Sequence, residues 1–168
     1  TRSFDFQTNM YLRKFSVDLS YVRYGGYFMV DINDSLGIDT VVKRKDIKTQ
    51  NIGASINYIF NHKKFSYRAV YLQNERQKKS ADSWFSGIYF TRAIIDSERG
   101  FIPEHYWDLY PDTKDLQRAR TIQIGLQGGY AHTFVIGHFF GTLSLGAGLG
   151  YENLKFSDKT REELTLHG

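Results

Sequence analysis

The fold is decided by the ten residues from Thr142 to Tyr151, which read Thr-Leu-Ser-Leu-Gly-Ala-Gly-Leu-Gly-Tyr. Apolar residues alternate here with Gly, Ser and Thr, and a period of two predicts a β-strand. One face of the strand is apolar, while the other is polar and carries almost no bulk. Such a strand, with an aromatic residue at its end, is typical of a transmembrane β-barrel. Ten residues are also about long enough to cross a bilayer when the strand is tilted.

The same alternation recurs along most of the chain and predicts an all-β protein. Residues 50–60, for example, place Ile52 and Phe60 on one face, opposite small uncharged residues. About seven strands are expected, and no helix of useful length. Their approximate ranges are 4–7, 12–30, 50–60, 65–71, 83–95, 121–134 and a last strand from the turn near Gly137 to about Phe156. Gly25-Gly26 is expected to kink or bulge the second strand. In strand 83–95 aromatic residues fall on both faces, so the face in contact with lipid is left open.

The predicted connections conflict with a complete barrel. A tight connection is expected near Asn9, and the polar stretches 31–46, 74–82 and 96–119 are predicted to be loops. Seven is an odd number, whereas single-chain bacterial barrels have an even number of strands. Short and long connections should also alternate between the two ends, and the loop 96–119 breaks that alternation. Either one predicted strand is wrong or a short hairpin lies within that loop.

Composition favours one domain, residues 1–168, and excludes a helical membrane protein. Mean hydropathy is −0.44, and no apolar run approaches the ~18 residues that a spanning helix needs. Barrel strands escape this limit because only alternate residues face lipid. Aromatic residues make up 16%, which suits interfacial girdles or, alternatively, the core of a β-sandwich.

Two further counts exclude other kinds of site and partner. The chain has no cysteine, so disulfides, cysteine-ligated zinc and a thiol nucleophile are absent. The net charge is +4 without a basic block, so nucleic acid is not expected as a partner.

Three segments carry a resemblance to a known family. The first, residues 51–69, reads Asn-Ile-Gly-Ala-Ser-Ile-Asn-Tyr-Ile-Phe-Asn-His-Lys-Lys-Phe-Ser-Tyr-Arg-Ala and is followed by Gln77-Lys78-Lys79-Ser80-Ala81. Its most specific part is Asn61-His62-Lys63-Lys64-Phe65-Ser66-Tyr67. The second is Tyr11-Leu12-Arg13-Lys14-Phe15 with Asp18, Tyr24 and Gly26-Tyr27, and the third is the glycine-rich hairpin from Ala131 to Tyr151.

With these segments most of the chain resembles a family of Bacteroidota envelope proteins, domain of unknown function 4421. The resemblance implies an outer-membrane β-barrel and assigns no activity. Members of that family are longer, with more strands before the position of Thr1. The single domain is therefore expected to lack N-terminal strands of the full family.

The most enzyme-like cluster is His62 with Ser66 and Arg68. A serine and a histidine with a carboxylate could form a nucleophilic triad, as in outer-membrane lipid hydrolases. The chain has no Gly-x-Ser-x-Gly elbow, and barrel strands are rich in serine. A turn histidine and a lumen-facing serine are therefore favoured, and both residues are expected to be dispensable for any activity.

The remaining candidates also favour structural roles. His132 and His138 lie six residues apart without a nearby carboxylate pair, which is poor spacing for a metal. Calcium-type oxygen ligands occur together in one loop, at Asp31, Asn33, Asp34 and Asp39. The bidentate Glu and the fixed spacing of an EF-hand are missing from that loop. Gly146, Gly148 and Gly150 share one strand face with no helix after them, so they are not a phosphate loop. No catalytic, cofactor-binding or metal-ligating residue is assigned, and no cofactor is expected.

The loop from Asp96 to Arg118 contains both prolines and mixes aromatic residues with carboxylates. These residues are Phe101, Tyr106, Trp107, Tyr110, Glu98, Glu104, Asp108, Asp112 and Asp115. Long loops without regular structure are usually functional or disordered, and disordered segments are poor in aromatic residues. We therefore expect an ordered loop that folds over or into a barrel mouth, where its aromatic residues cap the mouth or stack on a sugar or peptide. Its acidic residues would face one of two basic sets, Lys43, Arg44 and Lys45 or Arg76, Lys78 and Lys79.

Together these features predict an antiparallel transmembrane β-barrel, or a large segment of one, in the bacterial cell outer membrane. The leading hypothesis is a non-catalytic porin-like pore, channel or structural component of the cell envelope. Its expected partners are outer-membrane lipid and other envelope proteins. The alternatives are a membrane-embedded hydrolase acting on lipid or cell-wall material, and a soluble β-barrel that binds an apolar ligand. The residues predicted to contact lipid are Leu143, Leu145, Leu149, Ile122, Ile124 and Leu126.

Overall fold

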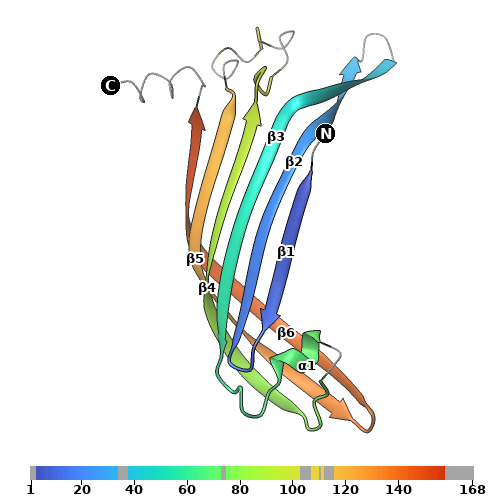
Figure 1. Cartoon of the computed structure of the whole chain (residues 1–168), viewed down its shortest axis with the longest axis vertical. Coiled ribbons are helices and arrows are strands. Elements are labelled where there is room, and N and C mark those ends of the chain that lie inside the picture. Colours follow the sequence, from blue (N-terminus) through green and yellow to red (C-terminus); the bar gives the residue numbers. More distant parts are fainter. Residues whose placement is uncertain are drawn as a thin grey trace.

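Six antiparallel strands form one sheet, in which each strand pairs with its neighbours in sequence (Figure 1). The computed structural model describes the backbone of residues 3–33, 38–72, 75–102, 107–109, 111 and 116–157, and their side chains outside 29–42. The strands are β1 (Phe4–Tyr11), β2 (Phe15–Asn33), β3 (Ile38–Ile59), β4 (Ala81–Ser97), β5 (Arg118–Ile136) and β6 (Phe139–Ser157). The prediction of an all-β antiparallel protein is confirmed.

The sheet is strongly curved but open (Figure 1). β1 and β6 are its edges, and they do not pair with each other in the described part of the chain. β3 has 22 residues, and β2, β5 and β6 have 19 each, about twice the 9–11 that a tilted strand needs to cross a bilayer. The strands are therefore long enough to extend beyond a membrane at one or both ends. A closed barrel, as the sequence predicts, is not formed by these six strands alone.

The strand predicted at 65–71 is wrong, because this segment contains a short helix, α1 (Tyr67–Tyr71). Ser66 caps the helix: the Ala69 N–H donates to Ser66 Oγ at 3.2 Å. Phe65 and Ala69 are both buried. Tyr67 and Tyr71 are four residues apart and lie on one side of the helical turn, with their ring centroids 5.0 Å apart. A capping residue outweighs a period-two pattern that is only seven residues long. Six strands, an even number, remain.

With that strand removed, the connection after β4 no longer falls at the same end as the turns at 12–14 and 137–138. The predicted alternation of short and long connections is still wrong, because the long segment 60–80 lies at the same end as those short turns. The turns at 12–14 and 137–138 and the segment 60–80 lie at one end of the sheet, and the β2–β3 hairpin and the loop after β4 lie at the other (Figure 1). The long loop predicted at 31–46 is wrong, since β2 runs to Asn33 and β3 begins at Ile38. Two strands can stay paired beyond the end of their apolar residues, because the pairing satisfies the hydrogen bonds of the backbone whether the side chains are apolar or polar. The connection predicted near Asn9 is wrong for the same reason, and β1 continues to Tyr11.

The bulge predicted at Gly25-Gly26 is confirmed. The pairing of β2 with β3 changes register between Gly25 and Tyr27. Gly26 has a φ of 81°, which residues with a side chain rarely adopt. Bulges increase local twist, and β3 bends sharply in this region of the sheet (Figure 1).

Candidate functional site

The buried core is small and lies between one face of the sheet and the segment that joins β3 to β4. Ile59, Phe65 and Ala131 are at most 1% exposed, and Tyr67 and Phe85 pack against them. We call residues 60–80, of which 73–74 lie outside the described residues, the plug segment. The face of the sheet that the plug segment covers is the inner face, and the opposite one is the outer face.

Helix α1 holds the plug segment against the first strand as well. The ring of Tyr71 stacks on that of Tyr11 from β1, with the ring centroids 4.7 Å apart. Tyr67 lies between Tyr71 and Phe85, with centroid distances of 5.0 and 6.3 Å. The pKa of the Tyr67 phenol is raised above its ordinary value. Burial is the largest cause, and a hydrogen bond with Tyr71 is the second. The phenol therefore stays protonated at neutral pH, and the plug segment contributes a packed aromatic cluster at one end of the inner face.

The outer face is mostly apolar. One row crosses all six strands in register, through Met10, Val17, Ile56, Ile88, Leu126 and Leu149. Leu149 and Leu126 in this row are 85% and 67% exposed. Other exposed apolar residues of the same face are Phe4, Phe6, Phe15, Leu19, Trp84, Phe90, Ile124, Phe134, Leu143, Leu145 and Tyr151. Soluble proteins rarely expose a patch of this extent. On β4, Trp84, Ile88 and Phe90 lie on this outer face, and Phe85 and Tyr89 lie on the inner face.

The inner face is polar and its side chains bond across the strands. Gln127 Nε2 donates to Asn57 Oδ1 at 2.7 Å, and Asn57 Nδ2 donates to Ser16 Oγ at 3.3 Å. β4 lies between the first two residues, and it carries Gly87 there. A Cβ at Gly87 would lie 2.5 Å from Asn57 Oδ1, so this glycine leaves room for the bond. Ser55 Oγ likewise donates to Asp18 Oδ2 at 2.8 Å. The middle of the inner face can therefore hold water or polar solutes, and its exposed apolar residues Ile95, Leu154 and Phe156 lie toward the end of the sheet opposite the plug segment.

Two aromatic residues of β4 lie across the glycines of β5 and β6. A Cβ at Gly129 would come within 2.5 Å of Phe85 Cζ, and one at Gly150 would come within 2.4 Å of the Tyr89 hydroxyl oxygen. A Cβ at Gly125 would also clash with the Tyr89 ring, at 2.6 Å. The small face predicted from the glycine-rich stretch is therefore correct, but part of the space is filled by side chains from the adjacent strand.

The cluster of His62, Ser66 and Arg68 does not form a triad. Ser66 Oγ donates to Glu75 Oε2 at 2.9 Å, and Arg68 Nη1 pairs with Glu75 Oε1 at 3.1 Å. The Nδ1 atom of His62 instead contacts the Ile59 carbonyl at 3.2 Å. A carboxylate is thus present, but it bonds to the serine rather than to the histidine. Ser66 caps α1, and the bonds of Arg68 and His62 hold the plug segment together and fasten it to β3.

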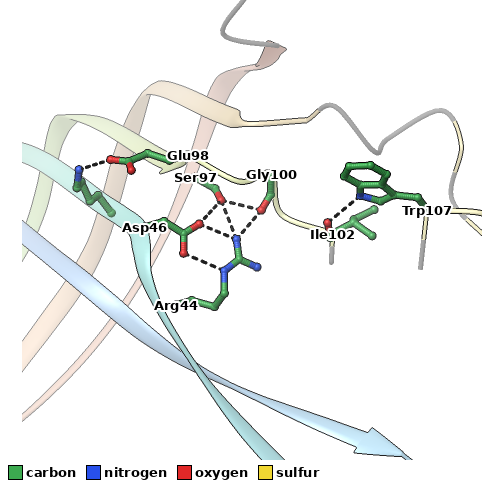
Figure 2. A network of polar contacts seen from close by, with 8 residues as sticks. Arg44, Asp46, Ser97, Glu98, Gly100, Ile102 and Trp107 are labelled. Carbon is green, nitrogen blue, oxygen red and sulfur yellow. Dashed lines mark hydrogen bonds and ion pairs between the residues drawn. The ribbon is translucent and has the colours of Figure 1, made fainter. Parts of the chain in front are cut away.

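The opposite end of the sheet holds a buried polar network (Figure 2). Arg44 on β3 forms a two-bond pair with Asp46, with distances of 3.0 and 2.8 Å. Its Nη2 also donates to Ser97 Oγ at 2.9 Å and to the Gly100 carbonyl at 2.6 Å. The hydrogen bond from Arg44 lowers the pKa of Asp46, which lies beyond the apolar part of β3, well below its ordinary value. This network fastens the beginning of the loop after β4 to β3.

The described residues show no ion pair between an acidic residue of that loop and either predicted basic set. Arg44 binds residues at its start, and Glu98 pairs with Lys48 at 2.8 Å. The second basic set lies at the other end, where Arg76 Nη2 donates to the Gly137 carbonyl at 3.2 Å. Trp107 Nε1 donates to the Ile102 carbonyl at 3.1 Å (Figure 2). The loop residues Glu104, Tyr106, Tyr110, Asp112 and Asp115 lie outside the described residues, so the cover over a mouth stays a prediction.

The described residues contain no group of three or more metal-ligating side chains. His132 lies on the outer face with its ring 4.2 Å from that of Phe134, and His138 is exposed in the β5–β6 turn. The suggested calcium ligands at 31–39 lie outside the described side chains. Within the described chain, no helix has the length and apolar character that crossing a membrane requires.

Comparison with known families agrees with the resemblance seen in the sequence. The sequence model of the domain of unknown function DUF4421 matches residues 1–166. The chain belongs to the DUF4421 family. No curated protein and no solved structure matches it. Membership in DUF4421 carries no assigned activity, so the function must be argued from the two faces of the sheet and the plug segment.

Sequence reasoning missed the Arg44–Asp46–Ser97 network. Arg44 and Ser97 are 53 residues apart, and only the pairing of β3 with β4 brings them together. The signal available in the sequence was an Arg-x-Asp pair on alternate positions of one strand, which is too common to indicate a buried network.

Proposed function

We propose that this DUF4421 chain forms the wall of a non-catalytic outer-membrane β-barrel that serves as a pore, channel or structural component of the cell envelope. The observation that carries the proposal is the apolar outer face, which is continuous across six strands and lies opposite a polar, glycine-rich inner face. Membrane barrels combine an apolar outside with a polar interior, along strands of alternating hydrophobicity. The row from Met10 to Leu149 repeats that arrangement on every strand.

The dimensions of the outer face support the same proposal. On β6 the apolar positions run from Phe139 to Tyr151. Thirteen residues at ~3.4 Å each and a tilt of about 40° give a band on the order of 30 Å tall, close to the ~25–30 Å of a bilayer core. The edges β1 and β6 must then pair with strands other than the six described, because backbone groups in lipid need partners.

The polar inner face argues against a soluble barrel that binds an apolar ligand, because such a barrel would place its apolar side chains inside. The plug segment lies on the inner face, so the proposed lumen is narrowed at that end. A closed or narrow channel is therefore favoured over a wide pore.

Detergent dependence and heat-modifiable gel mobility test the proposal. The protein should require detergent for solubility, should insert into vesicles of phosphatidylcholine, and should migrate differently on gels before and after boiling. A folded, monodisperse protein in buffer without detergent would contradict it.

A further inference from the structure

One end of the sheet carries an excess of positive charge. Residues 12–14 and 60–82 contain eight of the 22 Lys and Arg residues but only two of the 18 Asp and Glu residues. This region, the basic end, has a net charge of +6, whereas the rest of the chain has a net charge of −2. The fold holds the two stretches together, since the Ile59 N–H donates to the Lys14 carbonyl at 2.8 Å.

A cleft of about 340 Å³ opens within the basic end. Its charged lining consists of Arg13, Lys63, Lys64, Arg68 and Glu75, and His62 also lines it. Only one of the four cations, Arg68, pairs with the carboxylate. The Arg68 Nε atom is buried and has no hydrogen-bond partner among the described residues. An unsatisfied buried donor is costly, so an acceptor oxygen that reached it after a small rotation of the side chain would be stabilised.

Aromatic residues of the outer face border this end of the sheet. Trp84 is 64% exposed, and its ring centroid lies 5.1 Å from that of Tyr130. The ring centroids of Phe15 and Tyr58 lie 5.3 Å apart. His62 connects the cleft with this border, because the centroid of its ring lies 6.1 Å from that of the Tyr58 ring. In membrane barrels such rings lie at the level of the lipid headgroups. The cleft therefore lies next to the surface at which headgroup phosphates are found.

We propose that the cleft binds the phosphate group of an anionic phospholipid headgroup. This inference rests on the proposed function, since only a protein in a bilayer presents the cleft to headgroups. Lys63 and Lys64 supply compact charges, and the planar guanidinium of Arg13 can bind two phosphate oxygens at once. The same chemistry would suit a free phosphate, but the adjoining aromatic border favours the lipid.

The test compares two triple variants of the full chain in neutral detergent. The first, Arg13→Gln/Lys63→Gln/Lys64→Gln, removes three exposed cations of the cleft. The matched control is Lys43→Gln/Lys45→Gln/Arg99→Gln, which removes three exposed cations that line a second cleft at the opposite end. Native mass spectrometry then measures binding of phosphatidylglycerol, with phosphatidylcholine as the neutral lipid and inorganic phosphate as the soluble competitor.

The parent protein should bind phosphatidylglycerol in preference to phosphatidylcholine, and the first variant should lose on the order of 100-fold in that affinity. The control should keep it, and millimolar phosphate should not displace the lipid. Retention of affinity by the first variant, or an equal loss in the control, would overturn the proposal. Displacement by phosphate would reassign the cleft to a soluble phosphate and overturn the lipid assignment. A protein that needs detergent but shows no lipid preference contradicts this inference alone, whereas one that is soluble without detergent contradicts the proposed function.

Discussion

Arginine at position 145 should strongly destabilise the protein in a bilayer. Leu145 lies midway along the outer-face run of β6 from Phe139 to Tyr151 and is 82% exposed. Its side chain fills no core, so in a soluble protein the substitution would be nearly neutral. Near the middle of a bilayer, a lipid-facing arginine costs about 2–4 kcal/mol. That free energy corresponds to roughly a 30- to 700-fold change in the folding equilibrium constant.

Folding should be measured in phosphatidylcholine vesicles by urea titration, with the gel mobility shift as the readout. Ser144→Arg is the matched control, because it places the same side chain one residue away on the inner face. Its cost should be well below that of Leu145→Arg, since arginine there reaches water. An unchanged stability of Leu145→Arg, or an equal loss in both variants, would refute the orientation of the sheet.

Three further predictions concern the inner face and the two ends. Gly129→Ala should destabilise the protein by about 1–3 kcal/mol in the same titration, because the new Cβ would clash with Phe85 and with the backbone of β6. The control, Gly141→Ala, should have little effect, because no atom lies within 4 Å of the Cβ position there. Ser66→Ala should cost about 0.5–2 kcal/mol through the lost cap of α1 but should leave any acyl hydrolysis unchanged, and a hydrolysis that disappears in this variant would restore the hydrolase hypothesis. Deleting residues 101–112 should raise single-channel conductance in planar bilayers, whereas unchanged conductance together with rapid protease cleavage in the intact loop would show a mobile surface loop.

Most of the sheet can be predicted from the sequence because its main signal is local. The alternation in Thr142–Tyr151 depends only on adjacent residues, and it correctly predicts both the strand and its two faces. The bulge at Gly25-Gly26 is predictable for the same reason. The alternation at 65–71 predicts a strand, but these residues form a helical turn. The cap at Ser66 and the burial of Phe65 stabilise that turn.

The remaining features depend on pairings between distant residues. Phe85 and Tyr89 occupy the space above the glycines only because β4 pairs with β5 in one register. The carboxylate of Glu75 reaches Ser66 through the fold of the plug segment. The basic end, in contrast, is visible in the sequence as a count of charges, but its cleft is not. Each of these contacts needs the sheet register, which the alternation alone does not supply.

The most direct test of the account is a cysteine scan along β6. The chain has no cysteine, so each single-cysteine variant from Thr142 to Tyr151 carries one label. Spin labels in protein folded into vesicles should alternate with period two: the label at Leu145 should be relaxed by oxygen dissolved in lipid, and the label at Ser144 by a water-soluble nickel complex. Labels that all respond to the nickel complex, with no alternation, would contradict the claim that the outer face lies in a membrane.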